Sequence, residues 1–210
     1  MSGVLEIKNS NFEDLFSILF RNYSESVGPR FLILVGGCSR TGKSTLAKKI
    51  ESAFRKIGIS TITVELDNWL LGIDERTGNE TVRERYNYLA IVEAIMKLLN
   101  GEKIFPPIYN PKTRRVNRNN VSSDLQISKG VCIVEGVIAL DIPSLRDLSD
   151  FNIYTELNDK IRKKRLLEFY HQHKKFPIDK CNDIISAREL EEIPIIKETM
   201  IFADIVYYTE

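Results

Sequence analysis

The sequence predicts an α/β protein in which helices flank a parallel sheet. Three observations support this fold class. Short apolar runs that suit strands buried on both faces occur at residues 31–35 and 131–134. Segments with helical spacing of apolar residues separate the predicted strands, as crossover connections between parallel strands require. A glycine-rich segment joins the first apolar run to the helix that follows it.

Composition and charge fit one ordinary globular core. The chain has 210 residues, of which 43% are hydrophobic and 28% charged, and its net charge is +1. This balance gives no overall field that would attract nucleic acid or an anionic membrane. No apolar run approaches the ~20 residues of a membrane span, and the first residues lack a signal-peptide pattern. Three scattered cysteines suit reduced thiols, so we expect a cytoplasmic protein.

The glycine-rich segment, residues 37–44, fits the phosphate-binding pattern G-x-x-x-x-G-K-[ST]. Its glycines allow backbone N–H groups to turn toward phosphate oxygens, and the N-terminus of the following helix adds partial positive charge. We expect Lys43 to reach the β- and γ-phosphates and the Ser44 hydroxyl to bind Mg²⁺. The predicted nucleotide contacts are Gly37, Cys38, Ser39, Arg40, Thr41, Gly42, Lys43, Ser44 and Thr45. The sequence therefore predicts a protein that binds a nucleoside triphosphate with Mg²⁺.

The remaining elements follow from spacing and turn residues. Residues 1–30 form a helical extension, with Phe12, Leu15, Phe16, Leu19 and Phe20, that packs on a main domain of residues 31–210. The first domain helix spans 43–57 and buries Leu46, Ala47, Ile50, Phe54 and Ile57. A strand at 60–66 precedes a long helix that opens at the capping box 81–84, with the apolar stripe Leu89, Val92, Ile95, Met96 and Leu99. A strand at 151–154, helices at 158–175 and 193–202, and a strand at 204–208 complete the chain.

Two carboxylates follow predicted strands. The carboxyl ends of parallel strands face the ligand crevice, and Asp67 comes directly after the second strand. There Asp67 accepts a hydroxyl proton or helps to hold Mg²⁺, or else it only caps a turn. Glu135 follows four apolar residues, and a carboxylate at such a position is costly without a cation to bind. We expect Glu135 to hold the metal directly or through water.

Two basic segments carry most of the clustered positive charge. Residues 109–120 include Lys112, Arg114, Arg115 and Arg118, and the helix at 158–175 is rich in lysine and arginine. The apolar stripe of that helix is thin, so we expect a lid at about 158–176 that packs loosely and closes over the triphosphate. The alternative for both segments is a solvated surface.

Several motifs together resemble the uridine kinase and phosphoribulokinase family of P-loop kinases. Besides the phosphate loop, they are Glu-Leu-Asp-Asn-Trp after the second strand, Pro-Ile-Tyr-Asn at 107–110, Val-Glu-Gly-Val-Ile-Ala-Leu at 134–140 and Phe-Ala-Asp-Ile-Val at 202–206. The resemblance covers about residues 31–208. It implies a five-stranded parallel sheet and transfer of the γ-phosphoryl group of Mg-ATP to a primary hydroxyl. By position, Asp67 resembles the catalytic base, Tyr109 a tyrosine against the nucleoside base, and Arg162, Lys164 and Arg165 the lid cations.

The chain departs from this pattern on the acceptor side. Uridine kinases have a segment like Phe-Asp-His-Pro, whose Asp binds ribose, where this chain has Arg85-Tyr86-Asn87-Tyr88. Arg114 falls near a base-contacting histidine, and His173-Lys174-Lys175 replaces an Arg-Gly-Arg lid motif. We therefore expect Asp67, Tyr86, Asn87, Tyr109 and Arg114 to contact the acceptor. Uridine or cytidine is the leading acceptor, while another nucleoside, a sugar phosphate or a pantothenate-like alcohol stays open. An anionic acceptor would suit Lys112, Arg114 and Arg115 better.

Two further classes of protein are consistent with the phosphate loop. The altered acceptor positions suit a nucleotide-binding regulatory protein without transfer activity. A GTPase fits less well, because the sequence has no Asn-Lys-x-Asp stretch for guanine recognition. We expect a small-molecule partner, no nucleic acid and no membrane, and the resemblance implies a homo-oligomer.

Overall fold

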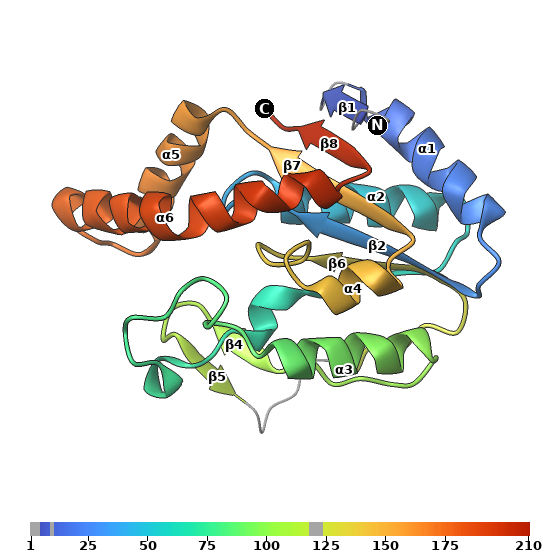
Figure 1. The fold of residues 1–210 in the computed structure, drawn as a ribbon, viewed down its shortest axis with the longest axis horizontal. Helices are drawn as coiled ribbons and strands as arrows, with labels where there is room; N and C mark the ends of the chain where they lie inside the picture. The colour runs from blue at the N-terminus through green and yellow to red at the C-terminus, as the bar shows by residue number, and fades with distance from the viewer. Residues whose placement is uncertain (1–4, 9–10, 118–123) are drawn as a thin grey trace.

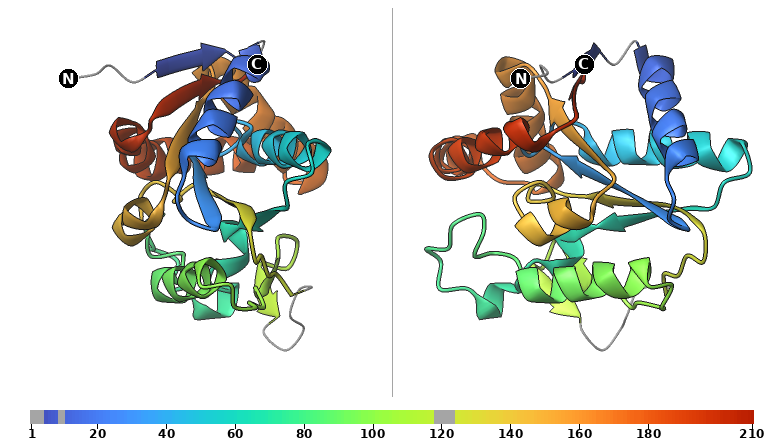
Figure 2. Two further views of the ribbon diagram at one scale, coloured as in Figure 1. Left: turned by 90° about the vertical axis from the view of Figure 1, so that its right-hand side faces the viewer. Right: turned by 45° about the vertical axis from the view of Figure 1, so that its right-hand side comes forward.

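The computed structural model describes residues 5–8, 11–117 and 124–210, which form an α/β fold (Figures 1 and 2). Six parallel strands form one sheet in the order β1-β8-β7-β2-β6-β3. Its strands are β1 (Leu5–Lys8), β2 (Arg30–Gly36), β3 (Thr61–Glu65), β6 (Gly130–Glu135), β7 (Phe151–Glu156) and β8 (Ile205–Tyr208). A separate antiparallel hairpin pairs β4 (Ile108–Asn110) with β5 (Arg115–Asn117). The predicted fold class is confirmed.

Helices connect the strands and cover both faces of the sheet. The α-helices are α1 (Phe12–Glu25), α2 (Lys43–Lys56), α3 (Tyr88–Leu99), α4 (Pro143–Leu148), α5 (Asp159–Glu168) and α6 (Ile178–Glu198). Short 3₁₀ turns are η2 (Leu66–Trp69), η3 (Ile73–Glu75) and η5 (Thr199–Phe202), and η4 (Phe169–His173) is a π-helical turn. In the described part of the chain, no helix combines the length and the apolar character that crossing a membrane would need.

The sheet has six strands rather than the five that the family resemblance implies. The additional strand, β1, comes from the N-terminal segment and pairs in parallel with β8, with Leu5 opposite Ile205. The helix α1 of the same segment packs on α2, where the rings of Phe16 and Phe54 meet edge to face at 5.1 Å. The N-terminal segment therefore extends the edge of the sheet and covers part of one face.

The central strand β2 separates two apolar cores. Residues 31–35 of β2 are almost wholly buried, as expected for a strand covered on both faces. On one face, Phe12, Leu15, Leu19 and Phe54 of α1 and α2 cover the sheet. The helices α3, α4 and α6 lie on the other face (Figures 1 and 2). Their residues Ile91, Ile95, Leu145 and Ile196 belong to the second core. The carboxyl ends of the strands lie between these two layers.

The third helix differs from its prediction in start and in buried face. Residues 81–84 form a turn in which Glu84 accepts hydrogen bonds from the N–H and hydroxyl of Thr81, but no helix follows directly. Residues 85–87 instead pair with 69–71, through hydrogen bonds such as Leu71 N–H to the Arg85 carbonyl at 2.8 Å. The helix α3 starts only at Tyr88, so Leu89 and Met96 are 71% and 48% exposed. Ile91, Ile95 and Leu98 form its buried face.

The helices on the C-terminal side also differ in extent from the sequence prediction. The helix predicted at 158–175 ends as an α-helix at Glu168 and continues as the π-helical turn η4. The helix predicted at 193–202 begins much earlier, at Ile178, and includes Pro194 in its interior. Ile57, predicted to be buried, is 50% exposed because α2 ends at Lys56. Arg118 of the predicted basic segment lies outside the described residues.

Candidate active site

The phosphate loop joins β2 to α2 and depends on glycine at two positions. Gly37 has a φ of 133°, and a Cβ atom there would lie 2.5 Å from the carbonyl oxygen of Thr155 on β7. Gly42 caps α2 in the left-handed region, with a φ of 93°. Side chains rarely adopt these conformations, so the loop requires glycine at both ends. Its backbone N–H groups lie at the N-terminus of α2, as the predicted nucleotide site requires.

The side chains of the loop are held by internal hydrogen bonds. Lys43 is 7% exposed, and its Nζ donates a hydrogen bond to the Cys38 carbonyl oxygen at 2.8 Å. The Thr41 hydroxyl donates to the same carbonyl at 2.8 Å. Burial raises the pKa of the Cys38 thiol, whose Sγ lies 3.5 Å from the Tyr154 hydroxyl. The Lys43 ammonium group is thus held at the loop, where the sequence motif predicts that it contacts the phosphates.

Ser44 and Glu135 have side-chain oxygens beside the loop. Glu135 ends β6, opposite Glu65 of β3, and its side chain is almost fully buried. Burial raises the pKa of this carboxyl, whereas Lys43 and a hydrogen bond with Ser44 lower it. A cleft of about 210 Å³ opens here, with Ser44, Glu65 and Glu135 among its lining residues. These groups fit Mg²⁺, which prefers oxygen ligands and in such sites takes only one or two from the protein.

The described residues contain no group of three or more His, Cys, Asp or Glu side chains that could hold a metal ion. That result is compatible with a magnesium site of the nucleotide-dependent kind. In such a site, phosphate oxygens and waters provide most of the ligands, and the protein adds a hydroxyl and a carboxylate.

Asp67 lies in η2, directly after the carboxyl end of β3. The hydroxyl of Tyr86 donates a hydrogen bond to Asp67 Oδ1 at 3.0 Å. Tyr86 is buried, and both burial and the negative charge of Asp67 raise its pKa well above the ordinary value. Tyr86 therefore stays a neutral donor. The sequence placed Tyr86 among the acceptor contacts, and in the structure its hydroxyl faces Asp67.

The other predicted acceptor residues lie around η2 with different surroundings. Asn87 caps α3, because its Oδ1 accepts a hydrogen bond from the N–H of Ala90 at 3.1 Å. Tyr109 is half-buried in β4, a strand that packs beside η2. Arg114 is exposed in the turn between β4 and β5, with a φ of 58°. The structure thus brings β4 beside η2, the turn that contains Asp67, while the side-chain oxygen of Asn87 accepts a hydrogen bond from its own helix.

The two predicted lid arginines have different partners. Arg162 is 1% exposed and pairs with Asp159 at 3.3 Å and with Glu189. Its positive charge slightly offsets the rise that burial causes in the pKa of Cys38. Its Nη1 is buried and finds no hydrogen-bond partner among the described residues. Arg165 donates to the main-chain carbonyl of Glu210. Arg162 thus keeps one N–H donor unpaired among the described residues, whereas Arg165 connects α5 to residue 210.

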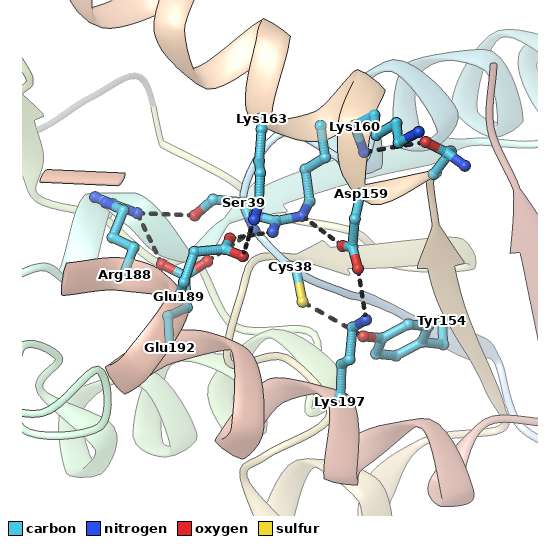
Figure 3. A network of polar contacts seen from close by, with 12 residues as sticks. Cys38, Ser39, Tyr154, Asp159, Lys160, Lys163, Arg188, Glu189, Glu192 and Lys197 are labelled. Atoms are coloured by element: carbon cyan, nitrogen blue, oxygen red, sulfur yellow. Dashed lines mark hydrogen bonds and ion pairs between the residues drawn. The ribbon is translucent and has the colours of Figure 1, made fainter. Parts of the chain in front are cut away.

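Two site residues on α6, Arg188 and Glu192, were not found from the sequence (Figure 3). Glu192 is 2% exposed, and its Oε1 accepts a hydrogen bond from the Ser39 N–H at 2.8 Å. Arg188 Nη1 donates to the Ser39 hydroxyl at 3.0 Å and to Glu192 Oε2 at 2.7 Å. Burial raises the pKa of Glu192, but Arg188 and Ser39 outweigh burial and hold it below the ordinary value. The i,i+4 spacing of Arg188 and Glu192 was the available signal, but many helices have such pairs.

The loop, the carboxylate Glu135 and the strand-end Asp67, arranged on this sheet, define a P-loop nucleotide-binding protein of the kinase type. A match to the phosphoribulokinase/uridine kinase family spans residues 32–208. The chain therefore belongs to that family, whose named members are phosphotransferases with hydroxyl acceptors.

Individual relatives agree with this assignment. A curated uridine kinase from Halobacterium salinarum is 28% identical over 148 residues, which are 67% of this chain and 62% of the relative. The chain thus spans less than two thirds of that relative's length. A possible uridine kinase from Bacillus stearothermophilus has a TM-score of 0.62 at 22% identity, with coverage of 93% of this chain and 98% of that one. D-glycerate 3-kinase from Cryptococcus neoformans has a TM-score of 0.67 at 13% identity, with coverage of 89% and 88%. The two structures support the fold.

Proposed function

We propose that the protein transfers the γ-phosphoryl group of Mg-ATP to a hydroxyl group of a small molecule. The observation that supports this proposal is the position of Asp67. Its carboxylate accepts the hydrogen bond of the Tyr86 hydroxyl. Its negative charge acts to raise the pKa of both Arg40 in the phosphate loop and Glu135. A potential general base thus lies beside a site for phosphates and metal, as in-line transfer requires.

In the proposed reaction, Asp67 accepts the proton of the acceptor hydroxyl while the acceptor oxygen forms a bond to the γ-phosphorus. The bond between the γ-phosphorus and the β,γ-bridging oxygen breaks, and ADP leaves with that electron pair. Lys43 and the unpaired Nη1 group of Arg162 neutralise charge on the phosphoryl oxygens. Ser44 and Glu135 would hold Mg²⁺, which offsets the negative charge of the phosphates when bound. The backbone of residues 37–45 would bind the phosphate chain.

The acceptor is the finer question. The names of the relatives make uridine the first acceptor to test, and cytidine follows as the related pyrimidine nucleoside. The family resemblance assigns the base contact to Tyr109, in the strand β4 that packs beside η2. An alcohol with a charged group is the second class. The expectations of a cytoplasmic location and a homo-oligomer come from the sequence and its resemblance, and the buried free thiols of all three cysteines are compatible with the former.

The experiment is ADP release with Mg-ATP across uridine, cytidine, other ribonucleosides, pantothenate and sugar phosphates, with Lys43→Ala as the blank. We expect an acceptor-dependent signal that Lys43→Ala abolishes. ATP binding without turnover on any acceptor would contradict transfer and favour a nucleotide-binding regulatory protein. Turnover unaffected by Lys43→Ala would refute the role of the phosphate loop.

A further inference from the structure

Three non-glycine residues of the described chain have a left-handed backbone, and all three are basic. They are Arg40, with a φ of 68°, and Arg114 and Lys175, each with a φ of 58°. Arg40 belongs to the phosphate loop, Arg114 to the turn between β4 and β5, and Lys175 to the segment between η4 and α6. Such conformations cost free energy and persist where the surrounding structure holds them, often at functional sites. Three separate segments thus adopt strained backbones at basic residues.

Side-chain contacts bring these three segments together. The guanidinium carbon of Arg40 lies 3.6 Å from the ring centroid of Phe169 in η4. Lys174 Nζ lies 5.5 Å from the same centroid and donates a hydrogen bond to the carbonyl oxygen of Pro111 in the β4–β5 turn. Phe169 thus serves as a shared cation–π platform for the loop and the lid. In Figure 1 the hairpin and the lid helices extend on the same side of the molecule.

The convergent cations form no ion pair with a carboxylate of the described residues. Burial lowers the pKa of Lys174, and the positive charges of Arg114, Arg40 and Lys112 lower it further. Among the described residues, no carboxylate lies at ion-pair distance from any of these four cations. The sequence grouped Arg115 with Lys112 and Arg114, but in the structure Arg115 pairs with Asp74 at 3.1 Å and is not part of this set of cations. Unpaired like charges at one place attract an anion strongly. We call Arg40, Lys112, Arg114 and Lys174 the anion subsite.

The anion subsite lies on the acceptor side of the proposed reaction. The strand β4, which leads into the turn with Lys112 and Arg114, packs beside η2 and therefore beside Asp67. Burial lowers the pKa of Arg40, and the nearby charge of Asp67 acts in the opposite direction. The metal-side groups Ser44 and Glu135 instead lie with the cleft toward β3. An anion on the subsite would thus lie on the side of the proposed base.

We propose that the acceptor is an alcohol that also carries a phosphate or carboxylate group, which binds to the anion subsite while the hydroxyl reaches Asp67. This inference rests on the proposed kinase function and names the class of its acceptor. The family resemblance assigns ribose binding to the position of Asn87. Its Oδ1 instead accepts a capping hydrogen bond from Ala90, which favours an anionic alcohol over a neutral nucleoside.

The test compares acceptor pairs that differ in the anionic group: ribose with ribose 5-phosphate, and glycerol with glycerate. Ribose 5-phosphate tests binding of a phosphate group and glycerate tests binding of a carboxylate group. The variant is Arg114→Asn, since asparagine tolerates a left-handed backbone better than most residues. The matched control is Arg115→Asn, which removes a charge already paired with Asp74. We expect Arg114→Asn to lower kcat/KM for the anionic acceptor about 10- to 100-fold with the KM for ATP unchanged, and Arg115→Asn to have little effect.

Binding of the same compounds, measured by calorimetry with a non-hydrolysable ATP analogue present, separates this inference from the proposed function. Selective binding of anionic alcohols that Arg114→Asn weakens, without turnover, would support the subsite and refute transfer. Equal use of neutral and anionic acceptors would overturn the subsite but leave the kinase function standing. An Arg114→Asn variant in which only the KM for ATP rises would have the same meaning. No binding of either class would overturn the subsite, and the acceptor panel with nucleosides would then decide on the kinase function. If Arg114→Asn does not fold, Lys174→Gln replaces it in the same assays.

Discussion

The hydroxyl of Tyr86 lies 3.0 Å from Asp67 Oδ1 and donates a hydrogen bond to it, although the two residues are far apart in sequence. The backbone pairing of residues 69–71 with 85–87 brings them together. A neutral, buried donor of this kind fixes the orientation of a carboxylate without neutralising its charge. Tyr86 thus has a positioning role toward the proposed base.

Replacement of Tyr86 by phenylalanine tests that role. Tyr86→Phe keeps the ring in the core but removes the donor, so Asp67 loses its orientation. We expect kcat to fall about 10-fold, the size of one hydrogen bond to a charged group, with the KM for ATP little changed. Steady-state kinetics on the best acceptor provide the measurement.

The matched control is Tyr88→Phe. The Tyr88 hydroxyl also donates to a carboxylate, Asp141 Oδ2 at 2.8 Å, but it lies on α3 outside the proposed site. We expect Tyr88→Phe to affect stability without changing kcat. Equal losses of kcat in the two variants would show that the Tyr86 effect is only structural.

Asp67→Asn tests the base itself. The amide cannot accept the hydroxyl proton, so we expect turnover to fall by at least ~10²-fold while ATP binding stays nearly intact. Turnover and nucleotide affinity, each measured over a range of Mg²⁺ concentrations, separate the two possible roles of Asp67. A loss that high Mg²⁺ restores would reassign Asp67 to the metal.

The sequence was sufficient where a function depends on residues adjacent in the chain. The phosphate loop, α2 and the carboxylates Asp67 and Glu135 are placed by local spacing, and the structure has them at the ends of the predicted strands. The buried strands could also be predicted from local patterns, because burial on both faces of a sheet produces continuous apolar runs.

The parts that the sequence did not predict depend on distant contacts. The strand β1 is short and stable only beside β8, and the start of α3 is set by pairing with residues 69–71. Arg188 and Glu192 lie in a highly charged stretch, where nothing local distinguishes a pair buried against Ser39 from solvated neighbours. The helix α6 itself was missed over most of its length because its apolar periodicity is weak.

The three cysteines should be unreactive in the folded protein. Their exposed fractions are 1% for Cys38 and 0% for Cys132 and Cys181, and burial raises the pKa of Cys132 to about 12. Because the thiolate is the reactive form, we expect iodoacetamide at pH 8 to label none of them rapidly without denaturant. Mass spectrometry in buffer and in urea checks this. Rapid labelling of Cys38 alone would show that the phosphate loop opens in the absence of nucleotide.

The pairing of Glu192 with Ser39 and Arg188 predicts a pH-dependent contribution to stability. The folded protein holds the pKa of Glu192 below its ordinary value, so the unfolded chain binds its proton first as the pH falls. The contribution is therefore present above the unfolded value of about 4.3 and is lost as the pH falls through the folded value. Glu192→Gln keeps an oxygen for the Ser39 N–H but loses the ion pair with Arg188.

We expect Glu192→Gln to lower the free energy of unfolding at pH 7 by about 1–3 kcal/mol. As the pH falls below about 4.3 the wild-type protein progressively loses the same contribution, so the difference between the two stabilities should shrink. Urea unfolding at several pH values from 7 to 3 measures this difference. The control is Glu168→Gln in α5, an exposed glutamate that should change stability little at any pH. The difference in free energy of unfolding between wild type and Glu192→Gln can depend on pH only through the charge of Glu192. A constant difference from pH 7 to 3 would therefore show that the ion pair with Arg188 does not stabilise the fold.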